Sequence, residues 1–204
     1  PKLKRWLAQD RIYALSYTTF IGSLLSQISI PHGSNRETSI EWRVVDILIE
    51  GLGNIRGEIA LFESSAREEG WLEERRFVRG VGLRGSWEVA ACWSSPQTRN
   101  YQDLFAGAIL VGLTILWAPE ECYLRAWRFA LGKVKVGKEA DVMQRVFIPN
   151  WSSREFETFV RKLGGLVNEM ATKCGVEERG WVWKECEAAW RQVIWVEKEF
   201  WPDV

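Results

Sequence analysis

Two segments of the chain, one near each end, place a carboxylate among apolar and aromatic residues at helical spacing. The same spacings of four, three and four residues join two sets: Trp6, Asp10, Tyr13 and Tyr17, and then Trp190, Ile194, Glu197 and Trp201. Residues so spaced lie on one stripe of an α-helix, so each stripe is expected to face inward. A buried carboxylate is costly unless it is paired or hydrogen-bonded. Asp10 and Glu197 are therefore predicted either to stabilise structure or to meet a polar ligand, and we favour the ligand.

The spacing of apolar residues is helical along the whole chain, with no strong alternation typical of strands. Helices are predicted over about 3–28, 38–69, 100–131, 140–145, 153–173 and 177–200. Pro119 is expected to interrupt or kink the third of them, and Ser152 or Ser153 to cap the fifth. The glycine-rich stretch 70–98 is expected to be an irregular excursion. The sequence therefore predicts an all-α protein, with residues 1–204 forming a single domain.

The composition is that of an ordinary folded protein without a global charge. Hydrophobic residues make up 47% of the 204 residues, and 27 basic side chains balance 27 acidic ones. This balance gives no global attraction to nucleic acid or to an anionic membrane. The four cysteines show no CxxC spacing, which is typical of reduced intracellular thiols. We therefore expect a soluble, cytoplasmic protein without nucleic-acid or membrane partners, in which the apolar run 104–118 is a buried central helix.

The sequence contains partial matches to cofactor-binding motifs, but the residues and predicted elements around them do not fit a cofactor site or a metal site. Residues 80–85 match GxGxxG, but no predicted strand precedes them, and residues 132–138 nearly form a P-loop that continues with Glu139 instead of Ser or Thr. His32 is the single histidine, which excludes the paired Glu-x-x-His motifs of a ferritin-like di-iron site. No zinc-type Cys/His spacing occurs either. No metal site is predicted, and any catalysis is expected to use carboxylates, tyrosines and water.

Five segments of the chain carry a resemblance to a known family. They read WLAQDRIY at 6–13, EIALF at 58–62, EECYLRAW at 120–127, NWSSREF at 150–156 and EKEFW at 197–201. In this order they resemble the WLxQDxxY, ExxxF, ExxYLxAW, NWSSxEF and ExxFW motifs of the TenA/THI-4 family, the thiaminase-II-like proteins of thiamine metabolism. The resemblance implies a haem-oxygenase-like helical bundle without a metal or organic cofactor, which forms a homo-oligomer, a dimer or a tetramer. The chain is expected to lack the family's N-terminal helix.

One departure from the family motif selects a subgroup. The common members have a Pro-Cys pair four residues before the tyrosine that corresponds to Tyr123, and here that position is Pro119. Glu120 instead resembles the subgroup that lacks the cysteine and carries Glu in this segment. Cys122 is adjacent to the tyrosine and lies off the expected helix face, so it is only the weaker candidate for a nucleophile. A second departure is Trp151, which occupies a sequence position close to that at which the subgroup with the cysteine has a tyrosine.

The resemblance and the residue types together suggest a site for a flat aminopyrimidine. Such a ligand calls for aromatic walls and for carboxylates that accept hydrogen bonds from its exocyclic N–H groups. Asp10 is predicted to bind the amino edge, Glu197 to transfer the proton as general acid/base, and Glu120 to orient or activate water. The remaining candidates for substrate contact are aromatic: Tyr13, Phe62, Tyr101, Trp151 and Phe200.

The function predicted from the sequence is a cofactor-free hydrolase of aminopyrimidine breakdown products of thiamine. One alternative is a non-catalytic protein of the same fold that binds a small molecule. Another is an enzyme of this fold that acts on a different flat metabolite. At the level of residues, Asp10 could instead be a structural ion-pair partner of an arginine, and either Glu120 or its neighbour Glu121 is expected at the surface.

Overall fold

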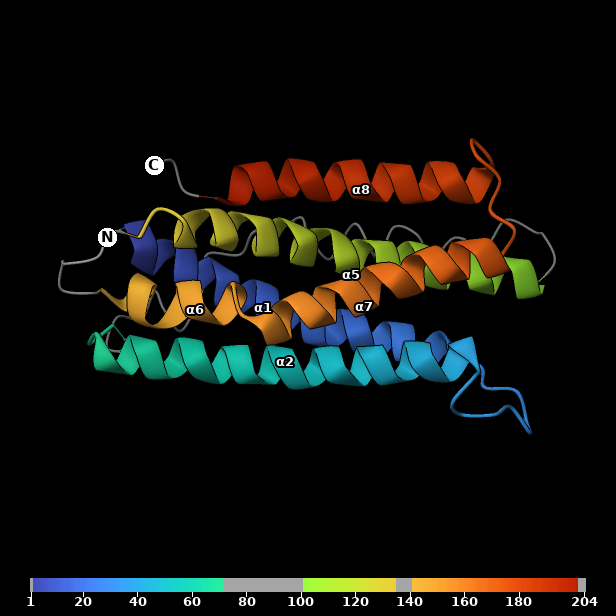
Figure 1. The fold of residues 1–204 in the computed structure, drawn as a ribbon, viewed down its shortest axis with the longest axis horizontal. Helices are drawn as coiled ribbons and strands as arrows, with labels where there is room; N and C mark the ends of the chain where they lie inside the picture. The colour runs from blue at the N-terminus through green and yellow to red at the C-terminus, as the bar shows by residue number, and fades with distance from the viewer. Residues whose placement is uncertain (1, 72–100, 135–140, 202–204) are drawn as a thin grey trace. The chain divides into compact units, whose positions relative to one another are not determined.

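The structure is a computed structural model that describes residues 2–71, 101–134 and 141–201 (Figure 1). Over these ranges the chain folds into helices joined by turns, and no β-strand occurs in them. The prediction of an all-α protein is therefore confirmed. The predicted irregular excursion at 70–98 lies outside the described residues, apart from its first two. The backbone contacts divide the chain into two compact units, Pro1–Gly112 with Lys198–Val204, and Leu113–Glu197. The single domain remains a prediction.

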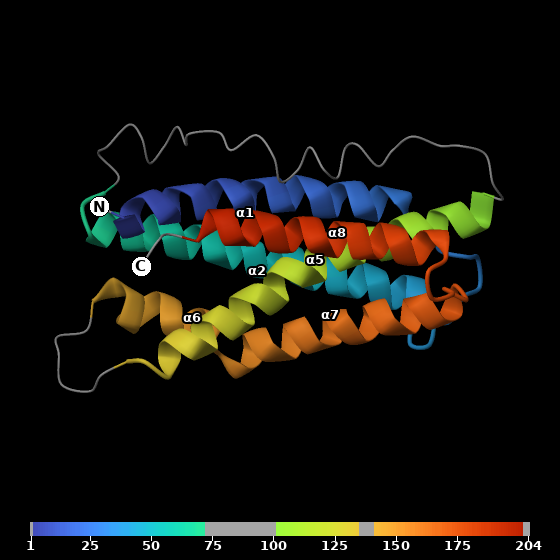
Figure 2. The ribbon, with the colours of Figure 1, turned by 90° about the horizontal axis from the view of Figure 1, so that it is seen from above.

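The first unit is built around two long antiparallel helices that lie side by side (Figures 1 and 2). Helix α1 spans Lys2–Gln27 and helix α2 spans Ile40–Glu68, close to the predicted ranges. Each buries a stripe of apolar side chains at helical spacing, including Leu7, Ala14, Ile21 and Leu24 on α1 and Val44, Leu48, Ile55 and Phe62 on α2. The connection between the helices contains Pro31 and a left-handed Gly33 at φ 82°, which explains why α1 ends where it does.

Helix α5, Tyr101–Leu131, begins in the first unit and continues into the second. It runs through Pro119 without ending, so the predicted interruption does not occur. The predicted buried central helix is confirmed, since Ile109, Leu113, Leu116 and other apolar side chains of this run are buried. Ala106–Leu131 is the one described segment long and apolar enough to cross a membrane by length and composition, and 67% of its apolar window is buried. The core helix of a soluble protein passes the same test.

The rest of the second unit consists of a π-helix and three α-helices. The π-helix spans Met143–Phe147 and passes directly into the short helix α6, Ile148–Trp151. The predicted helical piece at 140–145 is thus displaced toward the C-terminus. Helix α7 spans Arg154–Lys173 and begins as predicted, because the Ser153 Oγ atom accepts a hydrogen bond of 3.1 Å from the Phe156 amide.

The last helix, α8, spans Trp181–Phe200, so it begins four residues later than the predicted start at 177. Two left-handed residues in the preceding turn, Gly175 at φ 58° and Arg179 at φ 65°, explain the delay. A right-handed helix cannot include residues with a positive φ, so α8 can begin only after Arg179.

Within the second unit, α5 and α8 run in parallel and pack against each other (Figures 1 and 2). The Thr114 hydroxyl of α5 donates a hydrogen bond to the Cys186 sulfur of α8, and the Trp117 and Trp190 rings lie 5.0 Å apart. One to two turns further along both helices, the charge of Glu197 acts on Cys122. We call these residues the α5–α8 seam: Thr114, Trp117 and Cys122 on α5, and Cys186, Trp190 and Glu197 on α8.

Candidate functional site

Asp10 lies in the buried face of α1, as its spacing predicted. Asp10 is only 3% exposed to solvent. On the same face, Trp6 is 4% exposed and Tyr17 is 6% exposed, and Tyr13 is half-buried. Several polar atoms of this face are shielded from solvent, namely Trp6 Nε1, Gln9 Oε1, Asp10 Oδ2 and Tyr17 Oη. This helix face therefore carries polar atoms among its aromatic rings, which makes it a candidate ligand-binding face.

Aromatic rings from both ends of the sequence surround this face within the first unit. Trp6 stacks on Trp201 with ring centroids 5.5 Å apart and an interplanar angle of 24°. Phe200 lies 6.1 Å from Trp6 and 6.4 Å from Tyr13, and Tyr13 lies 5.9 Å from Tyr17. The structure therefore brings together two predicted site residues, Tyr13 and Phe200, that are nearly the whole chain apart in sequence. Offset and tilted ring pairs of this kind stabilise their arrangement beyond simple burial.

An ion pair joins α1 to α2 next to Asp10. The Arg11 Nη2 atom donates a hydrogen bond of 3.0 Å to Glu63 Oε1. The arginine adjacent to Asp10 therefore pairs with a different carboxylate. Phe62, which precedes Glu63, is fully buried at 1% exposure, so the structure places this predicted pocket wall in the core of the first unit.

Glu197 is the buried acid of the second unit, at 8% exposure. It lies on α8 one turn before Phe200. The predicted inward stripe around it is wrong at Ile194, which is 40% exposed. The helix instead buries Ala189 and Glu197, and Ile194 lies at the edge of this buried face.

Cys122 is half-buried on α5, within electrostatic reach of Glu197. Burial first, and then the negative charges of Glu197 and Glu121, raise the pKa of the Cys122 thiol from 9.0 to about 11, although the positive charge of Arg125 opposes this rise. At neutral pH the group is therefore a protonated thiol, whereas the nucleophilic form of a cysteine is the thiolate. This environment disfavours Cys122 as a nucleophile.

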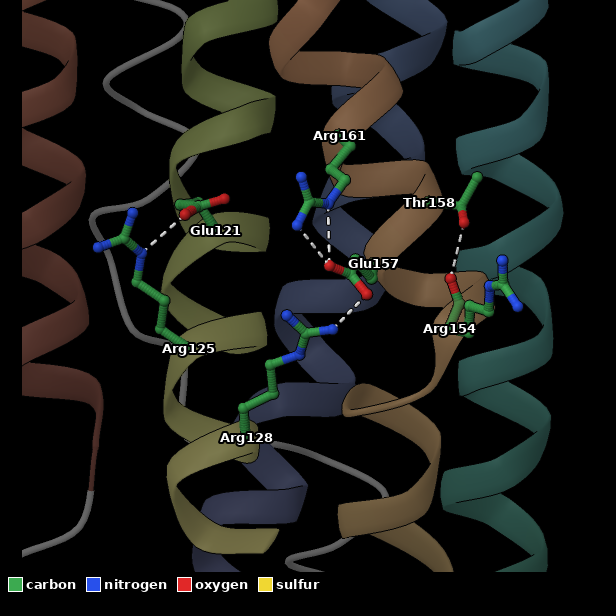
Figure 3. Close-up of polar contacts among 7 residues, drawn as sticks. All are labelled: Glu121, Arg125, Arg128, Arg154, Glu157, Thr158 and Arg161. Atoms are coloured by element: carbon green, nitrogen blue, oxygen red, sulfur yellow. Dashed lines mark hydrogen bonds and ion pairs between the residues drawn. The ribbon is translucent and has the colours of Figure 1, made fainter. Parts of the chain in front are cut away.

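The two neighbouring acids of α5 differ in their surroundings. Glu121 pairs with Arg125, whose exposed side chain donates a hydrogen bond of 2.7 Å from Nε to Glu121 Oε1 (Figure 3). Glu120 is half-buried and directly follows Pro119, which is buried. Glu121 therefore takes part in a surface ion pair, and Glu120 remains the predicted water-orienting acid.

Trp151 is almost fully buried, at 1% exposure. Its ring stacks on Trp127 at 4.8 Å and on Phe147 at 5.5 Å, and it meets Tyr123 edge-on at 5.7 Å. Trp151 thus forms the centre of an aromatic cluster that supports Tyr123. Tyr123 and Trp127 were not among the predicted site residues, although both are fixed letters of the ExxYLxAW motif that the sequence resembles.

A second ion-pair network joins α5 to α7 near these residues (Figure 3). Glu157 accepts hydrogen bonds from Arg128 of α5 and from Arg161 of α7, the latter at 2.7 Å. These two guanidinium groups lower the pKa of Glu157 from 4.5 to about 2. The network fixes α7 against the half of α5 that carries Glu120 and Tyr123.

The remaining sequence predictions for the site concern Tyr101 and a metal ion. Tyr101 is the first residue of α5, and its side chain lies outside the part of the chain that the structure describes, so its predicted role stays a prediction. Among the described residues no group of three or more His, Cys, Asp and Glu side chains could hold a metal ion.

The helical fold and the buried acids define the class as an all-α protein that buries two carboxylates, Asp10 in a face of α1 that carries aromatic rings and Glu197 on α8. No family model and no solved structure matches the chain. Over 97% of its length the chain is 21% identical to a protein of Glycine max named a probable bifunctional TENA-E protein, of which it covers 76%. This distant similarity supports a TenA-like family for the chain.

A second relative carries a different name. Over 97% of its length the chain is 22% identical to a protein of Fusarium pseudograminearum (strain CS3096) named a probable transcription factor. The chain spans only 44% of that protein, so it is similar to less than half of the Fusarium relative.

Proposed function

We propose that this protein is a cofactor-free hydrolase of aminopyrimidines of the kind released when thiamine breaks down. The observation that carries the proposal is the burial of Asp10 at 3% exposure in a face of α1 lined by Trp6, Tyr13 and Phe200. A carboxylate enclosed by rings suits a flat ligand with N–H groups at its edge. The similarity to the TENA-E protein over 97% of the chain also supports it.

In this proposal the two buried acids have different tasks. Asp10 accepts hydrogen bonds from the exocyclic amino group of the pyrimidine, and Tyr13 and Phe200 contact the ring. Glu197 acts as general acid/base: it takes a proton from the attacking water and delivers one to the leaving amine. Water replaces the amino group of an aminomethylpyrimidine, which yields the hydroxymethylpyrimidine and ammonia.

Water is the nucleophile in this proposal. The raised pKa of Cys122, about 11, keeps that thiol protonated at neutral pH, so the reaction does not proceed through a thiolate. Glu120, half-buried on α5, orients the water. We also propose the haem-oxygenase-like arrangement of helices and the assignment to the subgroup without the cysteine, on the basis of Pro119 and Glu120 in the motif.

The direct test is an activity assay with matched ligands. The purified protein is incubated with 4-amino-5-aminomethyl-2-methylpyrimidine and with its N-formyl derivative, and ammonia and formate are measured. Release that depends on both Asp10 and Glu197 supports the proposal. Tight binding without any turnover contradicts the hydrolase and favours a binding protein.

The Fusarium relative supports a second candidate function, a non-catalytic module, and we propose that such a module would use the Asp10 face to bind a small molecule. Its printed name, a probable transcription factor, is not that of an enzyme. A binding module keeps the ring-lined Asp10 face and needs no acid/base residue. In a binding module, Asp10→Asn should weaken pyrimidine binding. Glu197→Gln should leave binding unchanged, and neither the wild type nor this variant should turn over the pyrimidine. Calorimetric titration of the two variants separates this candidate from the hydrolase.

A further inference from the structure

Gln9 is a polar residue of the ring-lined α1 face to which the proposed reaction gives no role. Its Oε1 atom is shielded from solvent, and no residue in the described part of the chain donates a hydrogen bond to it. A buried acceptor without a donor is costly, because it has lost its hydrogen bonds to water. A donor supplied by a ligand would remove this cost, so the carbonyl oxygen of Gln9 is a candidate for direct contact with a ligand.

The position of Gln9 on α1 places it beside the aromatic rings of this face. Gln9 follows Trp6 by three residues and precedes Tyr13 by four, so the three residues lie along one side of the helix. Phe200 lies 6.1 Å from Trp6 and 6.4 Å from Tyr13, measured between ring centroids. Phe200 therefore spans the turn of α1 that carries Gln9 and Asp10.

Gln9 and Asp10 flank the row of rings on opposite sides. An α-helix turns by about 100° per residue, so Gln9 lies about 60° to one side of Trp6 and Asp10 about 40° to the other. Asp10 Oδ2 is shielded from solvent as well. Amide and carboxylate oxygens both accept hydrogen bonds from N–H groups. A flat ligand held against this row can pair with both acceptors only if it carries donors at two positions.

We propose that Gln9 makes this face specific for aminopyrimidines that carry a second nitrogen donor, an inference that rests on the proposed function. Asp10 accepts a hydrogen bond from the amino group on the ring. Gln9 Oε1 accepts one from the nitrogen of the aminomethyl substituent on the neighbouring ring carbon. Both substrates of the proposed reaction, the aminomethylpyrimidine and its N-formyl derivative, carry this second N–H. A pyrimidine with a methyl group in its place leaves Gln9 unpaired and binds more weakly.

The unpaired oxygen also has a consequence for the ligand-free protein. Gln9→Leu replaces a buried acceptor without a donor by an apolar group of similar size among aromatic rings. The midpoint of urea denaturation should therefore stay the same or rise, although the variant binds its ligand less well. A residue that stabilises the fold through its amide shows the opposite. A lower midpoint in Gln9→Leu than in the wild type thus overturns the proposal.

Calorimetric titration with two ligands tests the contact itself. 4-amino-5-aminomethyl-2-methylpyrimidine carries the second donor, and 4-amino-2,5-dimethylpyrimidine lacks it. Gln9→Leu should weaken binding of the first ligand by about tenfold, the effect of one hydrogen bond, and should leave binding of the second unchanged. Gln9→Glu keeps an acceptor and should retain the preference for the first. The matched control is Gln27→Leu on the same helix, where the exposed Gln27 amide donates a hydrogen bond of 3.1 Å to the Ser23 carbonyl. This control should change neither affinity.

The outcomes of the titration separate the role of Gln9 from the proposed function. If the wild type binds neither pyrimidine, both are overturned. If the wild type binds the aminomethylpyrimidine and Asp10→Asn weakens this binding, but Gln9→Leu leaves it unchanged, only the role of Gln9 is overturned. An equal loss of affinity for both ligands in Gln9→Leu overturns that role too, because a residue that merely shapes the face affects any pyrimidine alike. A loss confined to the ligand with the second donor supports it.

Discussion

The buried acids are where single residues are expected to matter most. Asp10 and Glu197 are two of the four buried polar or charged residues that the described part of the chain contains, and the other two are Ser65 and Thr114. Hydroxyl groups are easily satisfied by a nearby backbone carbonyl, whereas an enclosed carboxylate needs strong donors or a ligand. The two acids are therefore the residues to substitute first.

Glu197→Gln should abolish hydrolysis while the fold persists. Glutamine keeps the shape of the side chain but cannot transfer a proton, so we expect the turnover rate to fall by about 100-fold or more. Pyrimidine binding should change little. The matched control is Glu199→Gln, an exposed acid of the same helix, which should retain full activity. Equal activity of the two variants would show that Glu197 is not the acid/base residue.

The charge of Glu197 should be detectable at Cys122 without any assay of activity. The pKa of Cys122 is about 11, and the Glu197 carboxylate raises it more than the Glu121 carboxylate does. Glu197→Gln should therefore lower the pKa of Cys122. Glu121→Gln should lower it less. The thiolate is followed by its ultraviolet absorbance in a background that lacks the other three cysteines. A pKa of Cys122 that is the same in both variants contradicts the arrangement of the α5–α8 seam.

At the scale of elements, α7 depends on a close approach to α5. A Cβ atom added at Gly164 would lie 2.8 Å from Trp117 Nε1 and 2.9 Å from Cε2. The Trp117 ring is in turn packed against Trp190, so it has little room to shift. Gly164 is therefore the position at which helix α7 can approach the seam.

Gly164→Ala should destabilise the protein, although alanine favours helices. Overpacking of this kind raises the free energy of the folded state by about 1–3 kcal/mol. The control is Gly165→Ala, where an added Cβ meets no atom within 4 Å, and it should stabilise the helix by up to about 1 kcal/mol. Urea denaturation of both variants measures the difference. A stabilising effect at both positions would contradict the close packing of α7 on Trp117.

The ion-pair network between α5 and α7 should make stability depend on pH in the acidic range. Since the folded state lowers the pKa of Glu157 from 4.5 to about 2, the carboxylate stabilises the fold fully above pH 4.5. This contribution decreases as the pH falls from 4.5 toward about 2. In Glu157→Gln the free energy of unfolding should be lower at pH 7 and should change less over this range. Denaturant titrations at several pH values provide the comparison.

At the scale of the whole molecule, helical periodicity predicted most of the described fold. Apolar spacing and local signals such as Pro31 and Ser153 located the long helices within a few residues. The sequence did not predict which way α8 faces, since Ile194 is exposed. That orientation depends on the neighbouring helix, and residues at the edge of a stripe can face either way. The π-helix has no local signature that would have revealed it.

The candidate site was predictable only as separate motifs. The contact between Phe200 and Tyr13 followed from two motifs that the family resemblance placed together, not from any local pattern. The support of Tyr123 by Trp151 was missed, because a tryptophan in a short helix gives no sign of its packing partners. Side-chain contacts between distant segments need the tertiary structure.

Ligand binding should stabilise the whole chain against heat. A pyrimidine present at 100 times its dissociation constant adds about 2.7 kcal/mol to the free energy of unfolding, which a thermal-shift assay detects readily. Asp10→Asn should remove this stabilisation by the pyrimidine. Thiamine and its thiazole fragment serve as controls, and a shift with the thiazole fragment alone would place recognition elsewhere.

The parallel packing of α5 and α8 has a consequence for how the protein is made. The helices are joined by the residues of α6 and α7, so the partners Thr114 and Cys186, or Trp117 and Trp190, stand more than 70 positions apart in the sequence. Contacts of this separation form late in folding, because a long loop must close first. At typical rates of synthesis α8 leaves the ribosome on the order of ten seconds after the seam residues of α5. During that interval the apolar face of α5 in the nascent chain is not yet packed against α8. This is the stage at which a chaperone could bind the exposed apolar surface.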